Sequence, residues 1–94
     1  MPAIIAQVIS LESDPFPGWA RVRLESTDGR NVEMYDKQPV LGIELKQRGE
    51  VVHIDCEVVQ EQADSVTVRL LHGVETTEGL STVEVKRNQI AGLA

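Results

Sequence analysis

The stretch "WARVRLESTDGRNVEMY", residues 19–35, holds two runs of alternating apolar and polar residues on either side of an Asp-Gly pair. In the first run, Trp19–Glu25, small and aliphatic residues alternate with charged ones, which is typical of a half-buried strand. The Asp28-Gly29 pair favours a two-residue type I′ turn. That turn would set Leu24 opposite Glu33 and place a carboxylate on the apolar face, so it is excluded.

A three-residue loop over residues 27–29 removes this conflict, with its glycine in the left-handed backbone conformation. It sets Leu24 opposite Val32, so that apolar residues face each other across the two strands. It also sets Arg23 opposite Glu33, an exposed pair that contributes only about 0.2–1 kcal/mol. The hydrophobic pattern therefore fixes the register, and the sequence predicts a β-hairpin.

Other segments extend the strand pattern to both ends of the chain. Residues 3–11 are apolar on both alternating sets, as expected of a strand that is covered on both sides or shared between two sheets. Residues 14–18 hold two prolines and a glycine and form a connection. Residues 42–49 fit either a short strand or one helical turn. Residues 80–87 are predicted as a last strand, and residues 88–94 as a tail that frays.

A second hairpin is predicted around the polar loop of residues 61–63. Pairing Val58 with Val66 aligns the apolar residues of the two flanking runs. The same register sets Asp55 opposite Arg69, so the charge pattern agrees with the apolar pattern.

About six short strands joined by hairpins, without a helix of ordinary length, predict an all-β fold. The 94 residues are enough for a single domain with one modest core, so we assign residues 1–94 to one β domain. A small OB- or SH3-like barrel is preferred, because closing the sheet removes the free strand edges of so short a chain. A compact β-sandwich is the alternative.

The composition restricts the partners of this chain. Nine Lys and Arg residues stand against fifteen Asp and Glu residues, which gives a net charge of −6. Such a field repels nucleic acid and anionic lipid and favours a basic partner, although acidity also serves solubility. No apolar run approaches the roughly 18 residues of a membrane span, and the N-terminus lacks the basic residues of a signal peptide. We expect a soluble cytoplasmic protein without a membrane span.

The sequence predicts no catalytic residue, metal or cofactor. In "HIDC", residues 53–56, strand alternation places His53 and Cys56 on opposite faces, which excludes a Cys-His pair. One Cys and two His residues are too few for an ordinary zinc site. No nucleotide-binding, nucleophile or metalloprotease motif is present. Glu75 and Glu78 lie close in sequence, but nothing separates their pKa values into an acid and a base.

Two candidate interaction surfaces remain. Trp19 begins its strand, and Tyr35 is predicted opposite Arg21 on the outer face, a composition typical of protein interfaces. An aromatic plug over the end of the barrel is an equal alternative. The second candidate is the pair Glu75 and Glu78, as a contact surface for a basic group.

These two glutamates lie in "GVETTEG", residues 73–79. A tight hairpin centred on residues 76 and 77 would set Glu75 against Glu78, a like-charge pairing. We therefore predict a wider loop, with a type I turn over residues 76–79 and with Val74 tucked beneath it.

Several short motifs resemble those of a group of short bacterial proteins that have no known activity. The shared motifs are PGW at 17–19, DGR at 28–30, KQPV at 37–40, CEV at 56–58 and GVETTEG at 73–79. This chain has Thr76 where that group usually has serine, and Val83 where it usually has phenylalanine. The resemblance spans most of the chain and implies a small stand-alone β-protein.

The resulting hypotheses belong to different classes. The first is a non-catalytic module that binds an unidentified protein through Trp19, Arg21 and Tyr35 or through Glu75 and Glu78. The second is an acidic inhibitor or immunity-type protein that binds a basic enzyme. A third, single-stranded nucleic-acid binding, is permitted by the barrel alone. Its basic residues would be Arg21, Arg23, Arg30 and Lys37. An enzyme with an unrecognised site is the fourth, and the sequence leaves the oligomeric state open.

Overall fold

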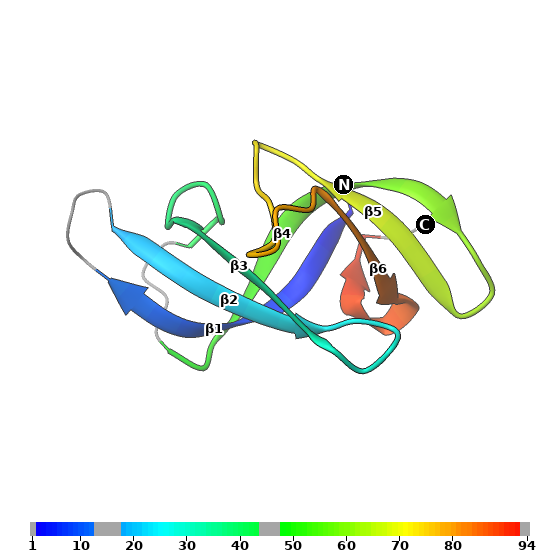
Figure 1. Cartoon of the computed structure of the whole chain (residues 1–94), viewed down its shortest axis with the longest axis horizontal. Helices are drawn as coiled ribbons and strands as arrows, with labels where there is room; N and C mark the ends of the chain where they lie inside the picture. Colours follow the sequence, from blue (N-terminus) through cyan, green and yellow to red (C-terminus); the bar gives the residue numbers. More distant parts are fainter. Residues whose placement is uncertain (1, 13–17, 44–47, 93–94) are drawn as a thin grey trace.

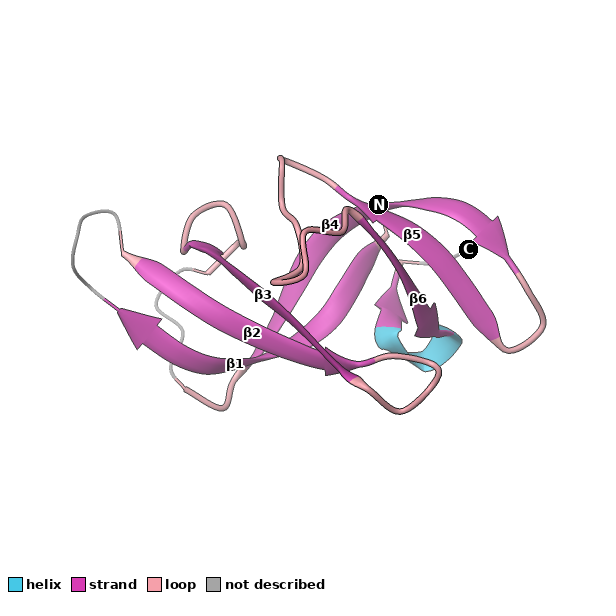
Figure 2. Cartoon of the chain, in the orientation of Figure 1, coloured by secondary structure: helices cyan, strands magenta, loops and turns pink. Residues whose placement is uncertain are grey.

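The all-β prediction is confirmed by the computed structural model, which describes residues 2–12, 18–43 and 48–92. Six of the seven described strands form one antiparallel sheet in the order β3-β2-β1-β4-β5-β6, and the short β7 pairs with β1. The sheet curls into a half-barrel (Figure 1). The strands are β1 (Ala3–Glu12), β2 (Trp19–Glu25), β3 (Asn31–Lys37), β4 (Val51–Glu61), β5 (Ser65–Leu70), β6 (Thr82–Lys86) and β7 (Ile90–Ala91). A 3₁₀ helix, η1 (Arg87–Gln89), connects the last two strands (Figure 2). Within the described residues, no helix has the length and apolar character needed to cross a membrane.

Strand β1 is shared between two partners. Residues 3–7 pair with β4, and from Gln7 onward β1 pairs with β2. The register with β2 shifts between Val8 and Ser10, which leaves Ile9 as an extra residue. Such a bulge bends the strand and increases its twist, and it lets the sheet curl at this point. The apolar character of β1 on both sets of residues fits its central position.

The β2–β3 hairpin has the predicted register. Leu24 lies opposite Val32, and Arg23 lies opposite Glu33. The N–H of Ser26 donates to the carbonyl of Arg30, which leaves residues 27–29 as the loop. Gly29 has a φ of +84°, the left-handed conformation that this loop requires.

The predicted register of the β4–β5 hairpin is wrong. Val58 lies opposite Val68 instead of Val66, and Arg69 lies opposite Glu57 instead of Asp55. The register then shifts between Val58 and Gln60. A slip of two residues keeps every side chain on its own face, so the apolar pattern alone cannot distinguish the two registers.

The core is aliphatic and lies inside the half-barrel. Its largest fully buried side chains are those of Ile4, Met34, Leu41, Ile54, Val8, Val22, Val66, Val68, Val74 and Val85. Two of these come from outside the strands: Leu41 follows β3, and Val74 belongs to the loop before β6. Of the ambiguous segment 42–49, residues 44–47 lie outside the described residues, while Ile43 is buried.

The C-terminal segment is ordered further than the sequence predicts. Beyond Lys86, the chain forms η1 and β7, and Ile90 and Ala91 pair with Ile4 and Ala3 of β1. Strand β2 pairs with β1 only from Gln7 onward, so β7 covers an edge that β2 does not reach. Ile90 is buried as a result. The expected fraying from residue 88 is therefore wrong up to residue 91, and residues 93–94 lie outside the described residues.

Candidate functional site

An aromatic and arginine cluster lies on the outer face of β2 and β3. Arg21 lies opposite Tyr35, as the register predicts, and the Trp19 ring stacks on the Tyr35 ring with 5.2 Å between centroids. The guanidinium carbon of Arg21 is 5.2 Å from the Tyr35 centroid, within the range of a cation–π contact. The adjacent residues Ala20 and Met34 are fully buried, so the cluster faces away from the core. We call Trp19, Arg21 and Tyr35 the outer-face cluster.

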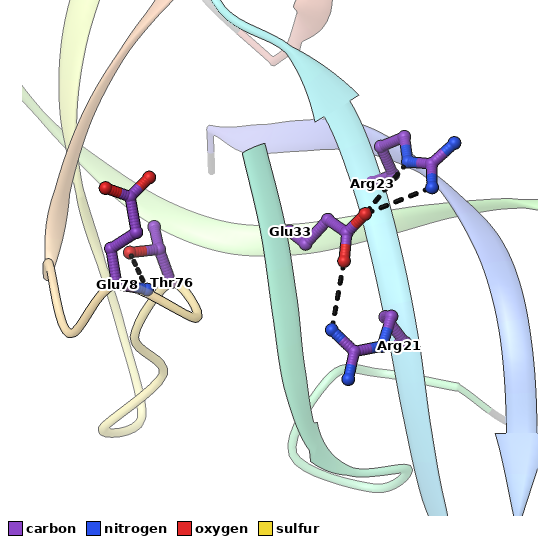
Figure 3. A network of polar contacts seen from close by, with 5 residues as sticks. All are labelled: Arg21, Arg23, Glu33, Thr76 and Glu78. Carbon is purple, nitrogen blue, oxygen red and sulfur yellow. Dashed lines mark hydrogen bonds and ion pairs between the residues drawn. The ribbon is translucent and has the colours of Figure 1, made fainter. Parts of the chain in front are cut away.

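Glu33 binds Arg21 of this cluster and the adjacent Arg23 (Figure 3). Its Oε1 accepts a hydrogen bond from Arg21 at 2.9 Å, and its Oε2 accepts bonds from Arg23 at 3.0 and 3.2 Å. The hydrogen bonds from Arg21 and then from Arg23 lower the pKa of Glu33, so the carboxylate stays charged near neutral pH. The sequence predicts the Arg23 pair directly. Arg21 reaches Glu33 diagonally across the two strands. The sequence also indicates this contact, because Arg21 lies two residues before Arg23 and therefore on the same face of β2.

Tyr35 is held from the side of β1 as well. Its hydroxyl donates to Oε1 of Glu12 at 3.1 Å, and Glu12 lies opposite Trp19 in the β1–β2 ladder. Partial burial, followed by the bond to Glu12, raises the pKa of Tyr35. Tyr35 as a whole residue is 37% exposed. Tyr35 is therefore oriented by three neighbours while part of its surface stays available for contact.

The loop of residues 73–79 has the predicted turn. The N–H of Gly79 donates to the carbonyl of Thr76 at 2.9 Å, which closes a four-residue turn. The Thr76 hydroxyl accepts bonds from the N–H groups of Glu78 and Leu80 at 3.3 and 3.1 Å. Val74 is buried beneath the loop, as predicted.

The sequence gives no sign of the second role of this loop, which is to cover part of the outer edge of β3. The N–H of Thr77 donates to the carbonyl of Glu33 at 2.8 Å, and Thr76 forms an antiparallel bridge with Met34. This contact accounts for the burial of Thr76. Its partner strand is about forty residues away in sequence, so no local pattern could have indicated it.

Glu75 and Glu78 are exposed, and among the described residues neither takes part in an ion pair. Their loop lies along the edge of β3, and the bridge between Thr76 and Met34 places Glu75 beside the position of Tyr35 on that edge. Figure 3 shows the Glu78 carboxylate apart from Glu33 and its two arginines.

In "HIDC", His53 is exposed and Cys56 is buried, on opposite faces of β4 as the alternation predicts. Cys56 is buried, and this burial, followed by the charge of Asp55, raises the pKa of its thiol to about 11. The Nε2 of His72 lies 3.1 Å from Oδ2 of Asp55, in a pair that is exposed on both sides. Residues 2–12, 18–43 and 48–92 contain no group of three or more His, Cys, Asp or Glu residues that could hold a metal ion.

The comparisons with known proteins gave no match. Neither the protein-family models nor the curated proteins nor the solved structures contain one that matches this chain. The arguments about function below therefore rest on the site itself.

Proposed function

We propose that this protein is a non-catalytic interaction module that binds a partner protein through the outer-face cluster. The observation that carries the proposal is the half-exposed Trp19–Tyr35 stack with Arg21 over the tyrosine ring. Trp, Tyr and Arg are the residues most enriched among those that dominate binding energy in protein interfaces.

Preorganisation supports the same proposal. Glu33 fixes Arg21, and Glu12 fixes the tyrosine hydroxyl, so these side chains have already lost much of their rotational freedom. A partner therefore has to order fewer side chains when it binds, which reduces the entropic cost of association. The strands beneath the cluster are held by a continuous ladder from Trp19 to Glu25.

Nucleic acid fits this surface less well than protein does. Arg21 and Arg23 share the carboxylate of Glu33, and Arg30 pairs with Asp28. Three of the four residues of the candidate basic cluster are thus already paired with acid. The net charge of −6 adds a repulsive field for phosphate.

Site-specific photo-crosslinking in the native host tests the proposal. A benzoylphenylalanine at position 37, which lies opposite Trp19, is expected to capture one protein partner. The control position is Val59, which is 53% exposed on β4. Capture at both positions alike, or at neither, would contradict the proposal.

The affinity of the purified partner then tests the individual residues. Trp19→Ala and Tyr35→Ala are each expected to weaken binding about thirtyfold, the effect of losing about 2 kcal/mol at a central contact. Arg21→Lys keeps the charge but loses the planar stack, so we expect a smaller loss. Val59→Ala should leave the affinity within about twofold. Unchanged affinity in the first two variants would show that the partner binds elsewhere.

A further inference from the structure

A groove lies between the two edge strands of the sheet. Strands β3 and β6 end the strand order on opposite sides, and the curl of the half-barrel brings them towards each other (Figure 2). The groove has a volume of about 330 Å³, near the lower limit for small-ligand pockets. Its walls come from the β2–β3 hairpin, the residue 76–80 loop and β6. We call this groove the seam.

The β3 wall presents backbone groups that β2 does not use. In an antiparallel ladder, residues alternate between exchanging hydrogen bonds with the neighbour and pointing their N–H and C=O groups away. The N–H of Ser26 donates to the carbonyl of Arg30 at 2.8 Å, so Arg30 is a residue that bonds to β2. Every second residue of β3 counted from Arg30 then bonds to β2 as well. Val32 and Met34 accordingly bond to β2, while the backbones of Asn31 and Glu33 point outward. Asn31 lines the groove, whereas the carbonyl of Glu33 is used by the loop at the covered end of the edge.

The β6 wall has the same character. The N–H of Leu70 donates to the carbonyl of Ser81 at 2.8 Å, so Val83 exchanges bonds with β5. Thr82 and Glu84 therefore point their N–H and C=O groups away from β5. Within the described part of the chain, these groups have no backbone partner.

The chain itself closes the seam at both ends but leaves the middle open. At one end, Thr76 bridges to Met34 of β3. At the other end, the hydroxyl of Thr27 donates to Oε1 of Glu84 at 2.7 Å. Between these contacts lie two strand edges that face a common groove. Such edges are templates for an added extended segment.

The charge of the seam indicates which segment fits. Asp28, Glu78 and Glu84 line the groove together with Arg30, so three negative groups and one positive group give a net charge of −2. Arg30 pairs with Asp28 at 3.4 Å. Glu78 and Glu84 take part in no ion pair with a described residue. The apolar members of the lining are Val32, Val83 and Leu80.

We infer that the seam binds a short extended segment of a partner protein that carries Lys or Arg. The backbone of the segment pairs with the free groups of β3 and β6, its apolar side chains cover the valines, and its cation lies near Glu78 and Glu84. A second copy of this chain is a poor occupant, because each copy carries a charge of −6. The inference rests on the proposed role as an interaction module, but it concerns a different surface from the outer-face cluster.

Selection of random heptapeptides on the immobilised 94-residue protein tests this inference. We expect enriched peptides in which Lys or Arg alternates with apolar residues. The double variant E78Q/E84Q should weaken the binding of a selected peptide about threefold to thirtyfold, as expected for the loss of two partly exposed ion pairs. The control E50Q/E57Q removes the same charge at two exposed positions that do not line the seam, and it should change the affinity less than twofold.

Backbone amide NMR of the complex then locates the peptide. The largest shifts are expected at Asn31, Thr82 and Glu84, which line the seam, with no loss of binding in Trp19→Ala. Enrichment of acidic peptides, failure to enrich any sequence, or equal weakening by both double variants would overturn the inference. Shifts confined to the outer-face cluster would also overturn it, while supporting the proposed function. If both surfaces act, the Trp19→Ala variant should lose capture of the partner protein at the outer-face cluster. The same variant should still bind the selected peptide in the seam.

Discussion

The two hairpins on either side of β1 turn in different ways. The β2–β3 hairpin uses the three residues 27–29, and the last of them, Gly29, has a φ of +84°. The β4–β5 hairpin turns over residues 63 and 64, because the N–H of Gln62 donates to the carbonyl of Ser65 at 2.9 Å. Neither residue of this turn has a positive φ, and the ladder is irregular next to Val59. In the first hairpin the apolar pattern, the Arg23–Glu33 pair and the turn glycine all specify the same register. In the second hairpin the bulge between Val58 and Gln60 and the packing of the strands specify the register, and the turn does not.

Packing should dominate the stability of the first hairpin. Met34 of β3 is fully buried, and Met34→Ala is expected to lower the free energy of unfolding by about 3 kcal/mol, within the usual range for such truncations. Val59→Ala at the exposed bulge of the second hairpin should change it by less than about 0.5 kcal/mol. Urea unfolding measures both variants. Similar losses would mean that the bulge residue is packed in solution.

The buried end of the second hairpin can be probed through Cys56 of β4. The ordinary pKa of 9.0 for a thiol is raised to about 11 in the folded protein. Between these values the folded state binds more protons than the unfolded state, so stability falls as the pH rises through this window. The full loss is about 2 to 3 kcal/mol for a shift of this size.

The control for this effect is Cys56→Ala, which is less stable at neutral pH but has no thiol to titrate. The difference in unfolding free energy between the two proteins should therefore shrink from pH 9 to pH 11. Thiol reagents should also modify native Cys56 slowly, because the thiolate is the reactive form. A constant difference across this pH range would show that the thiol is solvated in the folded state.

The turns themselves can be compared by single substitutions. Gly29→Ala places a side chain in the left-handed conformation and is expected to cost about 1–2 kcal/mol. Asp64→Ala in the other turn lies in a loop without positive φ and should change stability by no more than about 0.5 kcal/mol. Thermal unfolding at one protein concentration measures the difference. Equal effects would remove the distinction between the two turns.

This contrast explains which parts of the structure could be predicted. The β2–β3 register follows from the sequence because the apolar pattern, the Arg23–Glu33 pair and the turn glycine all agree. The outer-face cluster follows from that register. In β4–β5 the apolar pattern permits either register, and Arg69 finds a carboxylate in both, at Asp55 or at Glu57. Only the bulge next to Val59 distinguishes the two registers, and no residue type indicates where that bulge forms.

Contacts between distant segments lie beyond such patterns altogether. The bridge from Thr76 to Met34 and the pairing of Ile90 with Ile4 depend on how the sheet curls, not on alternation within one segment. The loop of residues 73–79 illustrates this. Its turn and the burial of Val74 were predicted from local chemistry, while its cover over β3 was not.

The smallest expected effect separates the two registers of β4–β5 most directly. Arg69 forms an ion pair with Glu57, and both side chains are about half exposed. A double-mutant cycle with Arg69→Ala and Glu57→Ala should give a coupling of about 0.2–1 kcal/mol. The matched cycle with Asp55→Ala should give almost none, because Asp55 lies beside His72 instead.

The unfolding free energy of a single variant cannot replace this measurement. Each substitution also changes the strand propensity and the solvation of its own position. The cycle cancels those contributions and keeps only the term that depends on the pairing. A slip to the alternative register would leave the core residues on their own face and transfer the coupling from Glu57 to Asp55. The sign of the difference between the two cycles thus reports the register in solution, even though neither ion pair matters much for folding.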